Sequence, residues 1–238
     1  MRTIWVINPN TTEAMTATIE QCARAVIAPG TTVTGVTSEI GPASIESHYD
    51  EAMAVPGLLR AIARGEAEGV DGYVIACFGD PGLDAARELA AGPVLGIAEA
   101  AMHTASHLGR GFSVVTTLAR TMGRAWDLAN HYGMQRFCRG VHACDIPVLN
   151  LETDPDARKV ITEACRDAIE EDGSDVVVLG CAGMASMCAP ISAELGVPVV
   201  DGVTAATLTV QSLITMGLGT SKRLEFAAPP PKDYTTGG

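Results

Sequence analysis

The amino-acid sequence predicts an α/β protein with two pseudo-symmetric lobes, each a short parallel sheet flanked by helices. Short aliphatic runs alternate with helix-length segments along the chain, which is the pattern of parallel sheets covered by helices. The same succession restarts near residue 111, so the unit occurs twice. Hydrophobic residues make up 47% of the chain but aromatic ones only 4%, and 25 residues are glycine. The core is therefore expected to be aliphatic, with many tight turns.

The first half is expected to contain four strands and four helices. A continuous apolar run at 72–76 indicates a strand buried on both faces. Thr11 or Thr12 is placed to cap the first helix, and a polar loop at 41–50 precedes the second. The predicted strands are 3–7, 32–37, 72–76 and 93–96, and the predicted helices are about 12–28, 51–68, 84–89 and 98–108.

The second half repeats this order. The apolar strand at 111–115 ends in Thr116 and Thr117, as the first strand ends near Thr11 and Thr12. Asp154 followed by Pro155 is typical of a helix start. The predicted strands are 111–115, a weak one within 138–148, 175–180 and 198–201, and the predicted helices are about 122–132, 155–171, 185–195 and 204–216.

Spacing within the two halves supports a duplication. From Cys77 to Pro93 is 93 − 77 = 16 positions, and from Cys181 to Pro198 is 198 − 181 = 17. We predict an N-terminal lobe of residues 1–103 and a C-terminal lobe of residues 104–203. The C-terminal helix, about 204–222, is expected to pack back on the N-terminal lobe.

Charge and cysteine usage exclude several classes of function. The formal net charge is 16 − 28 = −12, which argues against nucleic acid and anionic membrane surfaces as partners. No apolar stretch is long enough to span a bilayer and no signal peptide is visible, so a cytoplasmic location is expected. The seven cysteines, which include no Cys-x-x-Cys pair, are then expected to be reduced thiols rather than disulfides or zinc ligands.

Cys77 and Cys181 are the most informative residues. Each follows an aliphatic strand and precedes a glycine that opens a helix, and ligands of parallel α/β sheets lie at such strand ends. A helix N-terminus there is expected to favour the thiolate. Two thiols in duplicated halves suggest an acid and a base on opposite faces of one stereocentre. The alternative is that both are small buried hydrophobic residues, which does not explain their matching positions.

Three motifs carry a family resemblance: Ile7-Asn8-Pro9-Asn10-Thr11-Thr12, Ala76-Cys77-Phe78-Gly79-Asp80-Pro81-Gly82-Leu83 and Leu179-Gly180-Cys181-Ala182-Gly183-Met184. Over nearly its whole length the chain resembles the hydantoin racemases of the cofactor-independent aspartate/glutamate racemase superfamily. The resemblance implies an active site between the lobes, a homo-oligomer, and no metal or organic cofactor. It makes Cys77 and Cys181 the two catalytic thiols. It makes the following residues substrate-binding or thiol-positioning: Asn8, Gly79, Asp80, Thr116, Thr117 and Gly183.

The residues after the two thiols bear on the substrate. Amino-acid racemases of the superfamily typically follow the first Cys with Asn-Thr and the second with Thr-His, whereas this chain has Phe78-Gly79 and Ala182-Gly183. Phe and Gly at these positions suit a compact neutral ring better than a free amino acid, so the resemblance favours 5-monosubstituted hydantoins. Allantoin is a close rival, and another cysteine-dependent isomerase or a decarboxylase of this scaffold remains an alternative, as does a non-catalytic two-lobed binding protein.

Other polar residues are weaker candidates. Ser44, with Glu46, His48 and Asp50, could form a lid over the substrate, although such a cluster is more often a solvated loop. Asp80 is better explained as a cap of the helix that follows it than as a catalytic group. His103 and His107 have the i, i+4 spacing of metal ligands but no supporting motif, so we assign them to the surface or to helix packing.

Overall fold

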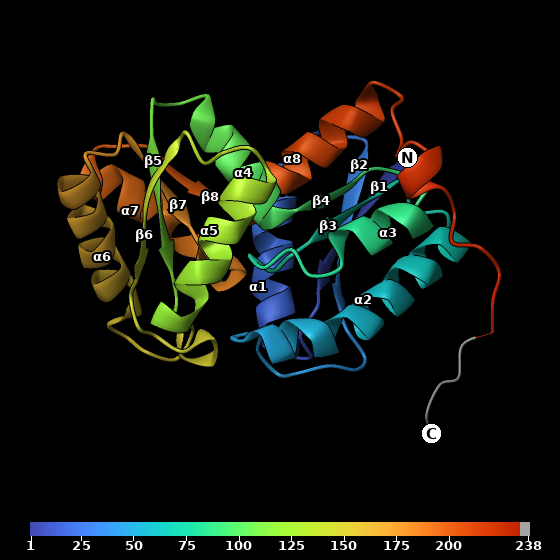
Figure 1. Cartoon of the computed structure of the whole chain (residues 1–238), viewed down its shortest axis with the longest axis horizontal. Coiled ribbons are helices and arrows are strands. Elements are labelled where there is room, and N and C mark those ends of the chain that lie inside the picture. Colours follow the sequence, from blue (N-terminus) through green and yellow to red (C-terminus); the bar gives the residue numbers. More distant parts are fainter. Residues whose placement is uncertain (234–238) are drawn as a thin grey trace.

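The computed structural model describes residues 1–233 and confirms a two-lobed parallel α/β fold (Figure 1). The first sheet has the strand order β2-β1-β3-β4 and the second the order β6-β5-β7-β8, with all neighbours parallel. The strands of the first sheet are β1 (Arg2–Asn8), β2 (Thr31–Thr37), β3 (Gly72–Ile75) and β4 (Val94–Gly96). Those of the second are β5 (Phe112–Thr116), β6 (Cys138–Ala143), β7 (Val176–Leu179) and β8 (Val199–Asp201).

Helices and short 3₁₀ segments connect and cover the strands. The α-helices are α1 (Glu13–Arg24), α2 (His48–Glu68), α3 (Leu83–Leu89), α4 (Ile97–Ser106), α5 (Met122–His131), α6 (Ala157–Asp172), α7 (Cys188–Leu195) and α8 (Gly202–Thr215). The 3₁₀ segments are η1 (Ala119–Thr121), η2 (Val148–Asn150), η3 (Ala182–Met187) and η4 (Leu224–Phe226).

Matching backbone hydrogen bonds in the two halves show the duplication at atomic level. Ala76 N donates to Ile7 O over 2.8 Å, and Gly180 N donates to Val115 O over 2.8 Å, so each cysteine leaves its central strands in the same way. The turns that follow also match. Asp80 N donates to Cys77 O over 2.9 Å and Met184 N donates to Cys181 O over 3.1 Å. The two thiols therefore occupy equivalent corners.

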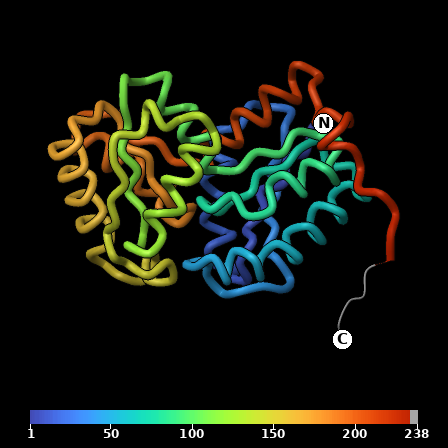
Figure 2. Tube along the Cα trace, in the orientation of Figure 1, coloured from blue at the N-terminus to red at the C-terminus, as the bar shows by residue number. Residues whose placement is uncertain are grey.

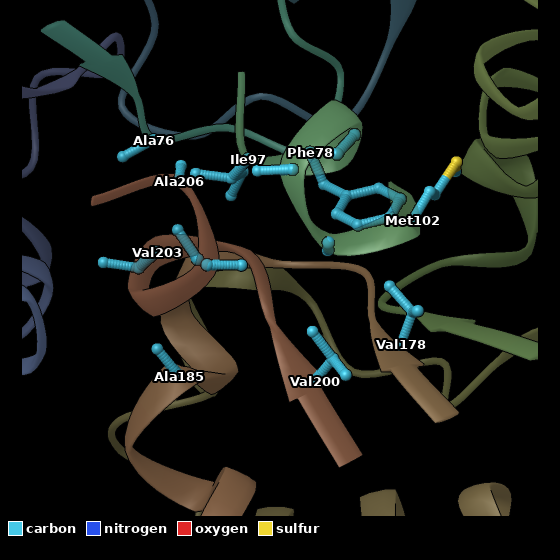
Figure 3. Close-up of a cluster of buried hydrophobic side chains, with 14 of the residues drawn as sticks. Ala76, Phe78, Ile97, Met102, Val178, Ala185, Val200, Val203 and Ala206 are labelled. Carbon is cyan, nitrogen blue, oxygen red and sulfur yellow. The ribbon is translucent and has the colours of Figure 1, made fainter. Parts of the chain in front are cut away.

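The two lobes share one continuous apolar core. Figure 3 shows Ala76, Phe78, Ile97 and Met102 from the first half facing Val178, Val200, Val203 and Ala206 from the second. Helices α4 and α8 pack against each other in this core, and a Cβ added at Gly202 would lie 2.3 Å from Ile97 O. Glycine at position 202 thus permits the close approach of the two helix starts. The shared core holds the two corners at a fixed relative position.

Helix α8 also contacts β3, β4 and α1, which belong to the first sheet and its cover. The chain trace in Figure 2 shows this helix lying beside the blue and green N-terminal segments, and its start also contacts β8 and η3 of the C-terminal half. The division of the chain at residues 103 and 203 stays a prediction.

Several helix starts differ from the sequence prediction. Helix α2 begins at His48, because the Ser47 hydroxyl accepts a hydrogen bond from Asp50 N, so the polar loop ends inside 41–50. Helix α6 begins at Ala157 rather than at Pro155, because Asp154 accepts a hydrogen bond from Asp156 N in a turn that precedes the helix. After Cys181 the chain forms η3 before α7 begins at Cys188.

Asp80 is the clearest correction. It does not cap α3, which starts at Leu83 after Gly82 in a left-handed conformation. Its carboxyl group instead accepts hydrogen bonds from Ala98 N (3.0 Å) and Glu99 N (2.9 Å) at the start of α4. The expectation of a capping role was correct in kind but wrong in the helix.

Candidate active site between the lobes

Cys77 and Cys181 both line a cavity of about 170 Å³ at the carboxyl ends of the two sheets. Each cysteine lies two residues past the end of a central strand, β3 or β7, and each keeps partial exposure. Parallel strands deliver their last side chains to the same edge of a sheet, and the shared core turns these two edges toward each other. The fold therefore brings two unpaired thiols from distant parts of the sequence to one cavity.

Most of the residues that the sequence singled out also line this cavity. Phe78 and Gly79 accompany Cys77, Ala182 accompanies Cys181, and Thr116 and Thr117 lie at the end of β5. The Thr116 hydroxyl is held 2.9 Å from the Thr121 hydroxyl and donates to Gly180 O over 3.4 Å. Thr116 thus joins the end of β5 to the residue that precedes Cys181.

Asn8 is fully buried and does not line the cavity. Its amide nitrogen donates to Asn10 Oδ1 over 2.8 Å and to the Thr16 hydroxyl over 3.1 Å. Asn10 is the residue of this motif that lines the cavity, beside Met15 of α1. The Asn-Pro-Asn-Thr motif therefore places Asn10 at the cavity and uses Asn8 to hold it there.

Three further predicted site residues also lie outside the cavity lining. Asp80 is buried, and Tyr132, the residue after α5, donates its hydroxyl hydrogen to Asp80 Oδ2 over 2.7 Å. Gly183 lies close to the Cys181 side chain, because a Cβ added at Gly183 would lie 3.8 Å from Cys181 Sγ. Ser44 precedes the wall segment 45–48, of which every residue lines the cavity.

Burial dominates the electrostatics of both thiols. Removal from water raises the pKa of the Cys77 thiol well above its ordinary value, and raises the pKa of Cys181 to about 12. Hydrogen bonds from the backbone of Gly79 and of Gly183 lower these pKa values, but by less. The backbone amides of the two corners thus act on the thiol pKa values in the expected direction, but in the substrate-free protein desolvation raises those values by more.

The sequence pointed to few residues of one cavity wall. On the N-terminal side Ile45, Glu46, Ser47, His48 and Glu51 form it, and on the C-terminal side Arg120, Thr121 and Arg124 do. Glu46 and His48 belong to the polar cluster that the sequence indicates, whereas the sequence singles out none of Glu51, Arg120 and Arg124 as a site residue. Their role in the wall depends on how the lobes face each other, which no local pattern records.

Polar contacts close this wall across the lobes. Val148 N, at the start of η2, donates to Glu46 Oε1 over 2.7 Å. Arg124 Nε of α5 lies 3.3 Å from Glu51 Oε1 of α2. Arg124 Nη2 also donates to Gly79 O over 2.6 Å. The rim of the cavity that the two thiols line is therefore held by polar contacts between the two lobes.

Within residues 1–233, no group of three or more His, Cys, Asp or Glu residues is arranged to hold a metal ion. His103 on α4 and His107, the residue that follows α4, are both exposed. No helix in the same range has the length and apolar character needed to cross a bilayer.

The protein thus has two α/β lobes of the same topology, with one thiol from each at a shared cavity. The family model for Asp/Glu/Hydantoin racemase matches residues 4–210, and the chain belongs to this family. The protein is a racemase, and hence an isomerase.

Individual relatives with 40% to 51% sequence identity match almost the whole chain. The hydantoin racemase of Rhizobium meliloti is 49% identical over 227 residues, which covers 95% of this chain and 94% of the relative. The structure of allantoin racemase from Klebsiella pneumoniae superposes with a TM-score of 0.97 at 51% identity, covering 99% of this chain and 97% of that one. Allantoin racemase from Pseudomonas fluorescens gives a TM-score of 0.94 at 40% identity, covering 98% and 100%.

Proposed function

We propose that this protein racemises 5-monosubstituted hydantoins by a two-base mechanism in which Cys77 and Cys181 act on opposite faces of C5. The observation that carries the proposal is the placement of both thiols, from equivalent corners, at one cavity. A racemase of this type needs one group to remove the proton and another, still protonated, to supply a proton from behind. A pair of thiols with one proton between them meets that need.

In one direction, one thiolate sulfur takes the C5 proton and becomes a thiol. The electron pair of the broken C–H bond delocalises into the adjacent ring carbonyl as an enolate. The opposite thiol then gives its proton to the other face of C5 and becomes the thiolate. The reverse reaction exchanges the roles, and the two sulfurs are the only protein groups that gain or lose a proton. For transfers of this kind the two sulfurs are expected to stand about 7 Å apart, with C5 between them.

The cavity supports a compact neutral ring near the sulfurs. Phe78 and Ala182 adjoin the thiols, and both residues are buried with apolar side chains. The amides of Gly79 and Gly183, which already interact with the thiols, are the groups available to stabilise developing negative charge. The part of the cavity beside the two thiols is therefore suited to the hydantoin ring. The C5 proton of that ring is acidic because its loss forms an enolate.

Allantoin is the second candidate substrate, because it is a hydantoin with a ureido group at C5. The polar wall of Glu46, His48, Glu51 and Arg120 offers carboxylate acceptors and cationic donors to such a group. The structures at 51% and 40% identity are both allantoin racemases, while the hydantoin racemase relative is 49% identical. Met15, Ile45 and Val148, which also line the cavity, would instead favour an alkyl or aryl substituent.

The proposal is tested by following the loss of optical activity of enantiopure substrates by circular dichroism. Allantoin, 5-benzylhydantoin and 5-isopropylhydantoin are compared with the wild-type protein. Cys77→Ser and Cys181→Ser are both expected to abolish racemisation, whereas Cys22→Ser, a thiol outside the cavity, is the matched control. Full racemisation by either catalytic variant contradicts the two-thiol mechanism, and no activity on any of the three substrates contradicts the substrate class.

We further propose that the protein acts in the cytoplasm as a homo-oligomer. All seven cysteines are free, and paired thiol chemistry requires a reducing compartment. Light scattering coupled to gel filtration tests the oligomeric state, and cell fractionation tests the location.

A further inference from the structure

We infer that Arg124 is a positioning residue for Cys77: from the opposite lobe it holds the carbonyl group of Gly79, the residue whose amide faces the Cys77 sulfur. Its role in racemisation rests on the proposed function, but its effect on the thiol does not.

The first step in the argument is the contact between Arg124 and the turn after Cys77. Arg124 Nη2 donates to Gly79 O over 2.6 Å, and this carbonyl belongs to the residue whose amide interacts with the Cys77 thiol. A carbonyl held by a charged donor cannot turn away without losing a strong hydrogen bond. A side chain of α5, the helix that follows β5 in the C-terminal lobe, therefore stabilises the orientation of this short turn.

Glu51 completes the arrangement from α2. Its Oε1 lies 3.3 Å from Arg124 Nε, and a Cβ added at Gly79 would lie only 2.4 Å from the same oxygen. Gly79 is thus enclosed between the Glu51 carboxyl group and the Arg124 guanidinium. Glycine at position 79 is required for this close approach of a carboxyl group to the backbone.

The second helix contact is independent of the first. Tyr132, also on the C-terminal lobe just past α5, donates to Asp80 Oδ2 over 2.7 Å. Helix α5 and the residue after it therefore contact the Cys77 turn at two adjacent residues, Gly79 and Asp80. Within residues 1–233, no arginine side chain donates a hydrogen bond to the turn after Cys181. Helix α1, which is equivalent to α5, packs against η3 and lines the cavity with Met15. The two thiols are consequently positioned by different means.

Charges around Cys77 come from every neighbouring element. Cys181 faces it across the cavity, Glu51 approaches from α2 and Asp80 from its own turn, and each raises its pKa, while Arg124 and His48 offset the charge of Glu51. Loss of Arg124 would free the Gly79 carbonyl and remove the guanidinium that partly offsets the charge of Glu51. Both changes disfavour the Cys77 thiolate and neither acts on Cys181.

The test measures alkylation of the two thiols by iodoacetamide in the substrate-free full-length protein, with each site quantified by mass spectrometry across pH. In Arg124→Met the alkylation of Cys77 is expected to slow by roughly 10-fold at a fixed pH, as for one unit of pKa, and that of Cys181 to stay within about 2-fold. Arg124→Lys is expected to recover part of the rate. Glu51→Gln keeps an acceptor but removes the charge, so Cys77 is expected to react faster.

Three outcomes separate this inference from its rivals. If Cys77 and Cys181 change together in Arg124→Met, with a lower melting temperature, Arg124 is merely structural and the inference is wrong. If neither thiol changes while KM rises, Arg124 binds substrate directly and the inference is again wrong. If the wild type racemises no hydantoin but the Cys77 effect is present, the positioning role stands and the proposed function fails. Arg166→Gln, an exposed arginine paired with Glu194 on the far side of the lobe, is the matched control.

Discussion

The carboxyl group of Asp80 occupies the space that a side chain at Gly96 would fill. A Cβ added at Gly96 would lie 2.1 Å from Asp80 Cγ, and the three atoms nearest to it all belong to that carboxyl group. Gly96 is the N-cap residue of α4 and has no side chain with which to cap it. Asp201 is the equivalent N-cap residue of α8, and its own side chain caps that helix by accepting a hydrogen bond from Thr204 N over 2.8 Å. The two halves therefore cap equivalent helices from different residues.

Asp80→Ala is expected to lower the free energy of unfolding by about 2–3 kcal/mol, because two amides of α4 and the Tyr132 hydroxyl lose their acceptor. Tyr132→Phe, which removes only one of the three hydrogen bonds, should cost about 1 kcal/mol. Urea unfolding followed by circular dichroism measures both.

A swap tests the explanation. Asp80→Ala combined with Gly96→Asp places the carboxyl group where Asp201 has it in the other half, so the double variant is expected to regain part of the lost stability. If Gly96→Asp destabilises the protein equally with and without Asp80, the two residues do not share a capping function.

The pH dependence of folding stability offers a further prediction at Asp80. Burial raises its pKa to about 6, above the ordinary value of 3.8, so the folded protein binds this proton more tightly than the unfolded chain. The contribution of Asp80 to stability is therefore greatest below pH 3.8 and declines as pH rises toward about 6. Asp80→Asn should remove this decline. The urea midpoints of the wild type and Asp80→Asn are compared between pH 3.8 and about 6. If both midpoints fall in parallel with rising pH, groups other than Asp80 cause the decline in stability.

The fold was largely predictable because its signals are local. The apolar strand 72–76, the thiol corner and the following proline recur with nearly equal spacing in the second half. Parallel pairing and helix cover then follow from the alternation of elements. A cap signal in a sequence points to the next helix along the chain, so it predicts an Asp80 cap for α3 rather than for α4. The pairing of Gly96 with Asp201 in the two halves is the sequence signal that α4 lacks a cap of its own.

The site was predictable only where its residues follow strands directly. Cys77, Thr116 and Cys181 are placed by sheet topology, so their appearance at one cavity follows from the fold. Arg124 and Glu51 reach the cavity from helices of opposite lobes, and their meeting depends on the angle at which α4 and α8 pack. No spacing in the sequence encodes that angle.

The pH profile of racemisation should rise toward alkaline pH. Because burial raises the pKa of both thiols, few molecules carry a thiolate near neutrality, and the fraction increases with pH. Initial kcat/KM measured from about pH 6 to about pH 10 should increase by up to 10-fold for each unit. A profile that is flat over this range would mean that the catalytic thiolate is already formed at neutral pH.

Gly79→Ala is expected to reduce kcat by more than about 10-fold with little change in melting temperature. Its methyl group would meet Glu51 Oε1 at 2.4 Å and displace the carboxyl group from Arg124. Gly123→Ala, at a helical glycine with open space around it, is the matched control and should keep full activity. Equal losses in both variants would refute a specific role for the approach of Glu51 to Gly79.

The contact between Glu46 and Val148 N gives a prediction about the cavity rim. Glu46→Ala removes the acceptor for that amide and should raise KM several-fold, because the wall segment is no longer tied to η2. Glu46→Gln retains an acceptor and should keep a KM near that of the wild type. Because the Glu46 charge raises the pKa of Cys181, the Gln variant should also alkylate faster at Cys181. An unchanged KM in Glu46→Ala would show that the rim contact is not needed to hold the substrate.

The measurement that tests the central claim most directly is hydrogen exchange at C5 in deuterium oxide, followed by NMR for each enantiomer separately. If Cys77 and Cys181 serve opposite faces, Cys77→Ser should exchange the C5 proton of one enantiomer only, and Cys181→Ser that of the other only, with neither variant racemising. Exchange of both enantiomers by either single variant would contradict a mechanism with one thiol on each face.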